Sequence, residues 1–118
     1  MSQIQELSNI QEFDILKNQI LKGVTHANNF KIVVLEKLLN SVNMTETKEN
    51  LARQLSLKNP DKPHPYFMEH NTVFDVLSNR LGLIQRVEKS FKIKGKFSPK
   101  QIKELRQCCK IRMGGFEN

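Results

Sequence analysis

The spacing of apolar residues changes at Gly82, and this change constrains the fold more than any other feature of the chain. Before Gly82, apolar residues recur at three- and four-residue steps, a spacing typical of amphipathic helices. After it, segments 83–87 and 91–94 alternate apolar with polar or charged residues on either side of residues 88–90. Such alternation predicts two short antiparallel strands joined by a tight turn. The sequence therefore predicts a mainly α fold with a small β-hairpin.

Two helices are expected in the first third of the chain. Residues 3–22 place apolar side chains on one face without Pro or Gly, and Gly23 is a natural C-terminal breaker. A second helix is expected over residues 30–42, which are apolar around most of the helix circumference. We therefore expect the second helix to lie centrally in the core. Residues 41–47 are expected to form a turn.

A third helix, a proline-rich loop and a fourth helix are expected next. Thr45 or Thr47 supplies a hydroxyl that can cap the third helix. Segment 59–65 holds three prolines and cannot be regular structure. Pro65 suits the first turn of a fourth helix, whose apolar spacing continues to Leu81.

A last helix is expected after the hairpin, with Ser98 as its N-cap and Pro99 at its first position. The only cysteines, Cys108 and Cys109, are adjacent, and neighbouring side chains are badly placed to bridge one another or to share a metal. We interpret them as reduced thiols, with one packed beneath the helix. A redox or metal role is the lesser alternative.

The length of 118 residues is sufficient for one core, so we expect a single domain. It would consist of an N-terminal helix (1–27), a core (28–97) and a C-terminal basic helix (98–118). No apolar run approaches the roughly 20 residues of a membrane helix, and the N-terminus lacks the pattern of a secretory signal. We therefore expect an intracellular protein that does not bind or span a membrane.

The net charge of +7 is concentrated in the second half of the chain. Residues 1–50 carry five Lys or Arg and six Asp or Glu, whereas residues 51–118 carry fourteen and six. Between residues 86 and 112, ten cations accompany only two carboxylates. This distribution favours a polyanionic partner, while a solvated lysine-rich surface explains the composition alone equally well.

The order of parts over residues 29–97 resembles the winged helix-turn-helix superfamily of DNA-binding proteins. The best match is the run 76–84 (Val-Leu-Ser-Asn-Arg-Leu-Gly-Leu-Ile), which leads into the pair of strands. The resemblance implies that the third and fourth helices form the helix-turn-helix and that the hairpin is the wing, with extra N-terminal and C-terminal helices. A weaker likeness is to winged-helix domains attached to restriction-type or HNH nucleases, in which a helix similar to 98–105 follows the wing.

In a winged helix, one helix lies in the major groove and the hairpin contacts the neighbouring DNA backbone. Asn71 could pair with adenine and Thr72 could reach a base or a phosphate, but Glu69 and Asp75 offset Arg80 on this helix. The hairpin carries the stronger positive charge. The candidate DNA-binding residues are Lys58, Lys62, His64, Tyr66, Asn71, Thr72, Asn79, Arg80, Arg86, Lys89, Lys92, Lys94 and Lys96.

The sequence predicts no catalytic or metal site. His26, His64 and His70 lack the spacing of a metal-binding set, and there is no phosphate-binding glycine loop or nucleophile elbow. We therefore expect neither enzymatic activity nor a cofactor. The expected function is that of a double-stranded DNA-binding module, as a transcriptional regulator or as the recognition domain of a DNA-processing system. A homodimer through the N-terminal helix is also expected. The alternative function is a protein-interaction module whose partner covers residues 66–79.

Overall fold

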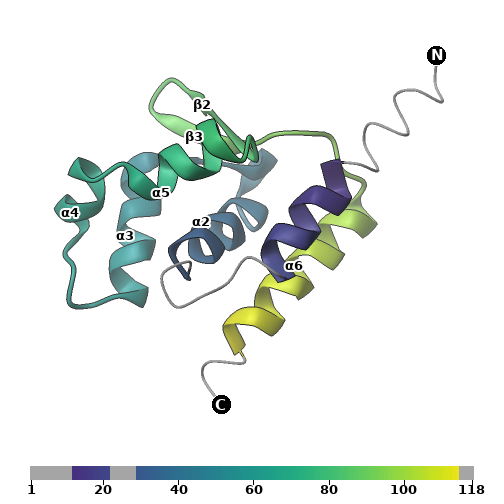
Figure 1. Cartoon of the computed structure of the whole chain (residues 1–118), viewed down its shortest axis with the longest axis horizontal. Helices are drawn as coiled ribbons and strands as arrows, with labels where there is room; N and C mark the ends of the chain where they lie inside the picture. The colour runs from purple at the N-terminus through teal and green to yellow at the C-terminus, as the bar shows by residue number, and fades with distance from the viewer. Residues whose placement is uncertain (1–11, 22–28, 115–118) are drawn as a thin grey trace.

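The computed structural model describes residues 12–21 and 29–114 of the chain. The described residues form a mainly α fold with a small antiparallel sheet of three strands, which confirms the predicted fold class. A helix over residues 12–21 comes first (Figure 1). The elements that follow are α2 (Asn29–Leu39), β1 (Thr45–Thr47), α3 (Lys48–Lys58), α4 (His64–Glu69), α5 (Thr72–Asp75), a π-helical segment (Val76–Arg80), β2 (Ile84–Val87), β3 (Ser90–Ile93) and α6 (Pro99–Gly114).

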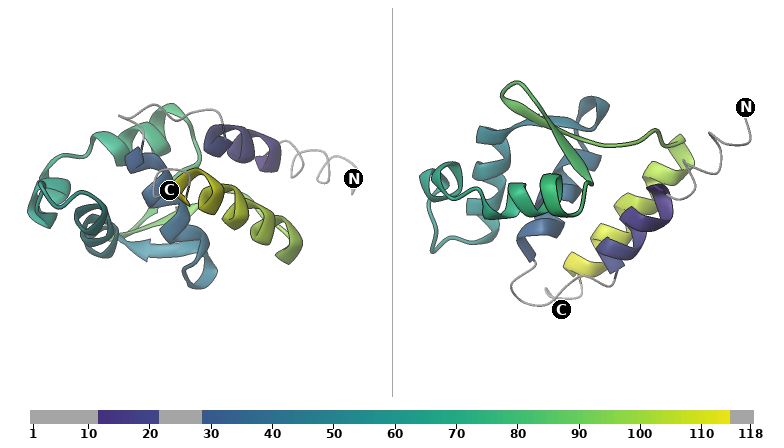
Figure 2. Two further views of the ribbon diagram at one scale, coloured as in Figure 1. Left: turned by 90° about the horizontal axis from the view of Figure 1, so that it is seen from below. Right: turned by 45° about the horizontal axis from the view of Figure 1, so that its top comes forward.

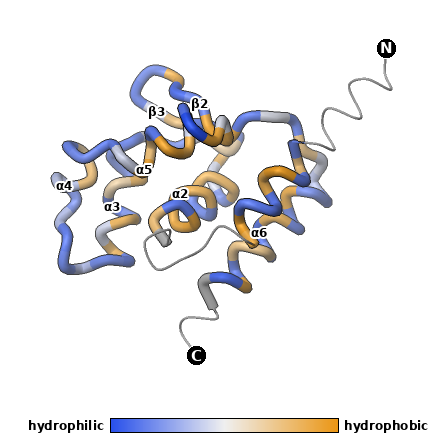
Figure 3. Tube along the Cα trace, in the orientation of Figure 1, coloured by the Kyte–Doolittle hydropathy of each residue, from blue (hydrophilic) through white to orange (hydrophobic). Residues whose placement is uncertain are grey.

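Helix α2 lies at the centre of the fold, as its apolar sequence predicts. It packs against both α3 and α6, and its residues 32–35, 38 and 39 are buried. Helices α3 and α4 lie on one side of α2, and α6 with the helix 12–21 lies on the other (Figures 1 and 2). The colouring of Figure 3 shows the same arrangement, because hydrophobic residues line the interior and hydrophilic residues follow the α3–α4 loop. One cluster of buried side chains joins these elements.

Helix α2 ends at Leu39 and not at residue 42, where the sequence places its end. Two polar side chains near its C-terminus bond to its own carbonyl groups: Asn40 Nδ2 donates to Glu36 O at 2.8 Å and Ser41 Oγ donates to Lys37 O at 2.7 Å. Such local bonds compete with the continuation of a helix. A 3₁₀ turn, Val42–Met44, follows.

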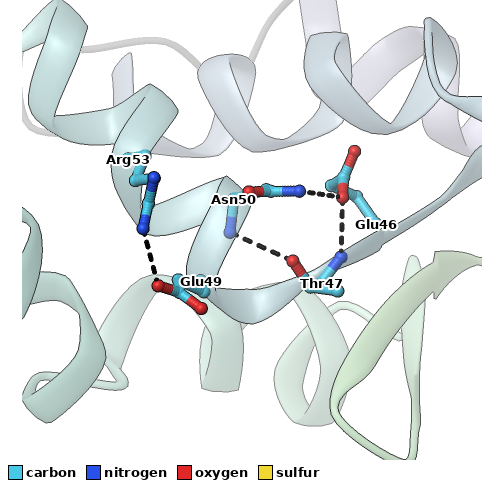
Figure 4. A network of polar contacts seen from close by, with 5 residues as sticks. All are labelled: Glu46, Thr47, Glu49, Asn50 and Arg53. Atoms are coloured by element: carbon cyan, nitrogen blue, oxygen red, sulfur yellow. Dashed lines mark hydrogen bonds and ion pairs between the residues drawn. The ribbon is translucent and has the colours of Figure 1, made fainter.

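Strand β1 is not predicted by the sequence, which assigns residues 41–47 to a turn. It pairs with β3, so the sheet order is β1-β3-β2. Thr47 ends the strand and caps α3 as predicted, because its hydroxyl accepts from Asn50 N at 3.1 Å (Figure 4). Glu46 Oε1 accepts from Asn50 Nδ2 at 2.8 Å and from Thr47 N at 3.0 Å. The Asn50 bond is the main cause that holds the pKa of Glu46 below its usual value.

The predicted single helix over residues 65–81 is wrong, because the chain breaks at Asn71 and forms α4 and α5. In a continuous helix, the carbonyl of Met68 would accept from the Thr72 N–H group. Here that carbonyl accepts from Lys48 Nζ at 3.0 Å. Asn71, a weak helix former, adopts φ −88° and ψ 7° and precedes α5. A long-range contact from α3 therefore accompanies the break.

The chain leaves α5 through the π-helical segment. Ser78 Oγ donates to Phe74 O at 2.7 Å, and the Leu81 N–H group reaches back five residues to Val76 O at 2.9 Å. Gly82 follows with φ 64°, a conformation that glycine adopts without strain. Gly82 therefore ends the helical region and turns the chain into β2, as predicted.

The hairpin and the last helix agree with the sequence prediction. Residues 88 and 89 join β2 to β3, with Glu88 at φ 58°. Ser98 caps α6 reciprocally: its Oγ accepts from Gln101 N at 3.1 Å, and Gln101 Oε1 accepts from Ser98 N at 3.0 Å. Cys108 and Cys109 are both free, and both are buried, whereas the sequence predicts that one of them is packed beneath the helix. Burial raises the pKa of both thiols, that of Cys109 to about 12.

The helix over residues 12–21 lies alongside α6 in every view (Figures 1 and 2). Leu16 and Ile20 are buried, and Lys17 Nζ lies 3.7 Å from Glu104 Oε2 on α6. Part of the apolar face of this helix is therefore used within the chain, although Ile15 remains 52% exposed. The homodimer through the N-terminal helix stays a prediction, and residues 1–11 lie outside the described part. Among the described residues, no helix combines the length and apolar character needed to cross a bilayer.

Candidate nucleic-acid interface

The exposed residues of α5 and its neighbours form a surface that we call the α5 face. It consists of Asn71, Thr72, Asp75, Asn79 and Arg80, all exposed. Four of these are predicted DNA contacts, and the structure places them together on one segment. The charge of this surface is mixed, since Asp75 accompanies Arg80 and the exposed Glu69 ends the adjacent α4. The α5 face therefore offers hydrogen-bonding groups beside charges of both signs.

Lys48 is the residue that holds the α5 face in place, and sequence reasoning does not identify it. Its Nζ donates to Met68 O and to the side-chain oxygen of Asn71, and lies 5.7 Å from the centre of the Phe74 ring. A bidentate contact of Asn71 with adenine would use the same oxygen that Lys48 already engages. Lys48 lies 23 residues from Asn71, so no local pattern reveals this contact.

The aromatic candidate Tyr66 is already packed within α4. Its ring stacks on that of His70 with centroids 4.1 Å apart, and Lys62 Nζ lies 4.5 Å from the centre of the Tyr66 ring. His70 Nδ1 lies 2.9 Å from Tyr66 O, which fixes the histidine ring across the last turn of α4. Three side chains near the proline-rich loop thus stabilise one another. Of the other candidates here, Lys58 is exposed and His64 is half-buried.

The hairpin cations, predicted to form one cluster, are divided between two faces of the sheet. Side chains alternate between faces along a strand, and directly paired residues share a face. Arg86 pairs with Phe91, which is buried against Phe74 with ring centroids 5.0 Å apart, so Arg86 belongs to the face toward α5. Lys92 pairs with Gln85 and belongs to the opposite face. Lys89 is exposed at the hairpin tip, and Lys94 is exposed beyond β3.

The sheet face opposite α5 borders a groove, which we call the sheet–α6 groove. It has a volume of about 780 Å³ and lies between the outer face of the sheet, the 3₁₀ turn and the first half of α6. Its lining residues are Leu39, Ser41, Asn43, Met44, Thr45, Gln85, Val87, Lys92, Gly95, Lys96, Phe97, Ile102 and Arg106.

The charged residues that line the sheet–α6 groove are all cations: Lys92, Lys96 and Arg106. Two described carboxylates lie near the lining. Glu46 accepts a bond from Ser41, and Glu12 approaches so close to Gly95 that a Cβ there would collide with it. Neither carboxylate lines the groove. The groove therefore presents a positive surface to solvent.

Arg106 is a groove residue that the sequence prediction misses. Its Nε donates to Leu39 O at 2.8 Å, across 67 residues of sequence, and so caps the C-terminus of α2. The bond uses one nitrogen of the guanidinium and fixes the side chain where α6 meets the sheet. Its position within a basic helix is the only sequence signal that points to it.

No metal centre is formed by the described residues, in which no three His, Cys, Asp or Glu side chains gather in a way that could hold an ion. His70 belongs to the α4 contacts described above, His64 is the first residue of α4, and His26 lies outside the described residues. Comparison of the chain with family models, with curated proteins and with solved structures finds no match in any of the three. The resemblance to winged helices therefore stays a prediction.

Proposed function

We propose that the chain is a double-stranded DNA-binding module. The observation that carries this proposal is the excess of exposed cations on the hairpin and α6. Over residues 86–112, only Glu88 and Glu104 oppose ten Lys and Arg side chains. Eight of those ten are exposed: Arg86, Lys89, Lys94, Lys96, Lys100, Lys103, Arg106 and Lys110. Such an excess of exposed positive charge attracts the phosphates of a duplex.

The element order supports the same proposal. A helix, a strand, two helical regions and a two-stranded wing follow one another, and the wing joins β1 in a sheet of order β1-β3-β2. The order of the helices and the hairpin is the one that the winged-helix resemblance implies, with a fourth helix that is broken in two; β1 is not part of that expectation. Transcriptional regulation or recognition within a DNA-processing system would both use such a module.

A titration with random duplex DNA tests the proposal. Binding that neutralises Z phosphates gives a slope of log affinity against log salt of roughly −0.9Z for duplex DNA. The groove and the hairpin tip together carry enough cations for about four to six phosphate contacts. The slope would then be about −4 to −5. Fluorescence anisotropy over a salt series measures it. Absence of binding at low salt, or a slope near zero, would contradict DNA binding.

The second candidate is a protein-interaction module, and the mixed charge of the α5 face favours it. Glu69 and Asp75 are both exposed there, and acidic side chains often mark a surface that is not pressed against phosphates. This candidate predicts a partner that covers the α5 face and an affinity with little salt dependence. Loss of partner binding on Asp75→Lys, with DNA affinity unchanged, would support it.

A further inference from the structure

We propose that the sheet–α6 groove, and not the α5 face, is where a DNA phosphate backbone binds. This inference rests on the proposed function and identifies the surface to which the DNA binds. Both surfaces border the same sheet, but they lie on opposite sides of it. Phe91 faces α5, whereas its neighbour Lys92 faces the groove.

The charges of the two surfaces differ in a way that decides between them. The groove is lined by Lys92, Lys96 and Arg106 without a carboxylate. On the α5 face, Arg80 is accompanied by Asp75, and the exposed Glu69 and the half-buried Lys48 lie beside them. A phosphate approaching the α5 face therefore meets an exposed carboxylate as well as a cation, whereas the two described carboxylates near the groove, Glu46 and Glu12, do not line it.

Two of the groove cations, Lys92 and Arg106, are positioned more firmly than free surface lysines. Lys92 is half-buried in the central strand of the sheet, flanked by its partners Thr45 and Gln85 on the neighbouring strands. Arg106 is fixed by the bond from Nε to Leu39 O, which leaves its remaining guanidinium nitrogens for a ligand. Less side-chain entropy is then lost when a phosphate binds.

The shape and the remaining lining also fit a nucleic-acid strand. A volume of about 780 Å³ holds a short stretch of backbone, and so would receive the phosphate ridge of one strand of a duplex. Gln85 adds an amide donor, a type of group that commonly contacts phosphates. Met44, Val87 and Ile102 supply apolar surface for the sugars.

A matched pair of double variants tests this inference. The groove variant is Lys92→Gln with Lys96→Gln, and the control is Lys58→Gln with Arg80→Gln, which removes the same charge from exposed residues on α3 and next to α5. Each variant is titrated with random duplex DNA and with poly-L-glutamate between about 50 and about 200 mM salt, and its thermal unfolding is recorded.

The groove variant is expected to reduce the magnitude of the salt slope by about 2, because two phosphate contacts are lost. Between the two salt concentrations, the wild type should lose about 10-fold more affinity than the groove variant. The control should keep the wild-type slope. A Lys92→Arg, Lys96→Arg variant retains both charges and should also keep the wild-type slope. It therefore distinguishes an effect of lost charge from an effect of disturbed folding.

Three outcomes overturn the inference. One is a control variant that loses the slope while the groove variant keeps it. Another is a loss of slope in the arginine variant as large as in the glutamine variant. The third is a groove variant that loses affinity for poly-L-glutamate but not for DNA, which assigns the groove to an acidic polypeptide. Failure of the wild type to bind DNA at all would instead overturn the proposed function.

Discussion

The two faces of the small sheet show how alternate residues of one hairpin acquire different roles. On the face toward α5, Phe91 and Ile93 are buried and close the core. On the other face, Lys92 lines an open groove. A cluster of cations in the sequence is therefore not one surface, because the pleat sends successive side chains to opposite sides. Substitutions on the two sides of the sheet should therefore differ in their effects on stability and on DNA binding.

The largest effect is expected from the neighbouring residues Phe91 and Lys92. Phe91→Ala removes a ring that is 6% exposed and stacked on Phe74, so it should lower the free energy of unfolding by about 3–5 kcal/mol. Lys92→Ala should change it by less than about 0.5 kcal/mol, because the side chain borders solvent. Urea denaturation measures both. Equal costs would show that the two faces are not distinct.

A smaller effect is expected when the contact that holds the α5 face is removed. Lys48→Met removes the donor to Met68 O and leaves that carbonyl and the Asn71 oxygen without this partner. The expected cost is about 1–2 kcal/mol, with faster amide hydrogen exchange at residues 71–75. Lys58→Met, at the exposed end of α3, is the control. Unchanged exchange in the Lys48 variant would show that Lys48 does not hold this face.

On the groove side, Arg106→Gln should destabilise the chain by about 1 kcal/mol, because Leu39 O loses its side-chain donor. The same change removes a groove cation, so the DNA salt slope should fall by about 1 in magnitude. Lys110→Gln, another exposed cation of α6, should affect stability little. A stability loss without any change of slope would remove Arg106 from the binding surface.

The smallest effect is expected at Glu46, in the edge strand β1. Its pKa is below the usual value of about 4.3, so its ionised form stabilises the fold above that pH. This contribution is lost as the pH falls through the lowered pKa of the folded state. Glu46→Gln should cost at most about 0.5 kcal/mol at pH 7, since the side chain is only half-buried and solvent screens its charge. The difference from wild type should shrink below pH 4 in pH-dependent denaturation.

Local signals in the sequence predict much of the fold. Thr47 and Ser98 cap helices where their hydroxyls suggest, and Gly82 ends the helical region before the hairpin. These features depend on neighbouring residues, so a short window of sequence contains the information. Strand β1 is missed because three residues are too few to show an alternation.

The long-range contacts could not be predicted. The break before α5 involves Lys48, 20 residues from Met68, and Arg106 reaches Leu39 across 67 residues. The candidate site was predicted as one run of hairpin cations, and the strand register divides it. Alternation along β3 could have suggested that division, but only the packing of Phe91 on Phe74 identifies which face is buried.

Amide chemical-shift mapping with a random DNA duplex tests the central claim most directly. We expect the largest salt-sensitive shifts at Thr45, Gln85, Lys92 and Lys96, which line the sheet–α6 groove. Residues 71–80 of the α5 face should shift less. The largest shifts at residues 71–80, with the groove residues unchanged, would contradict the account.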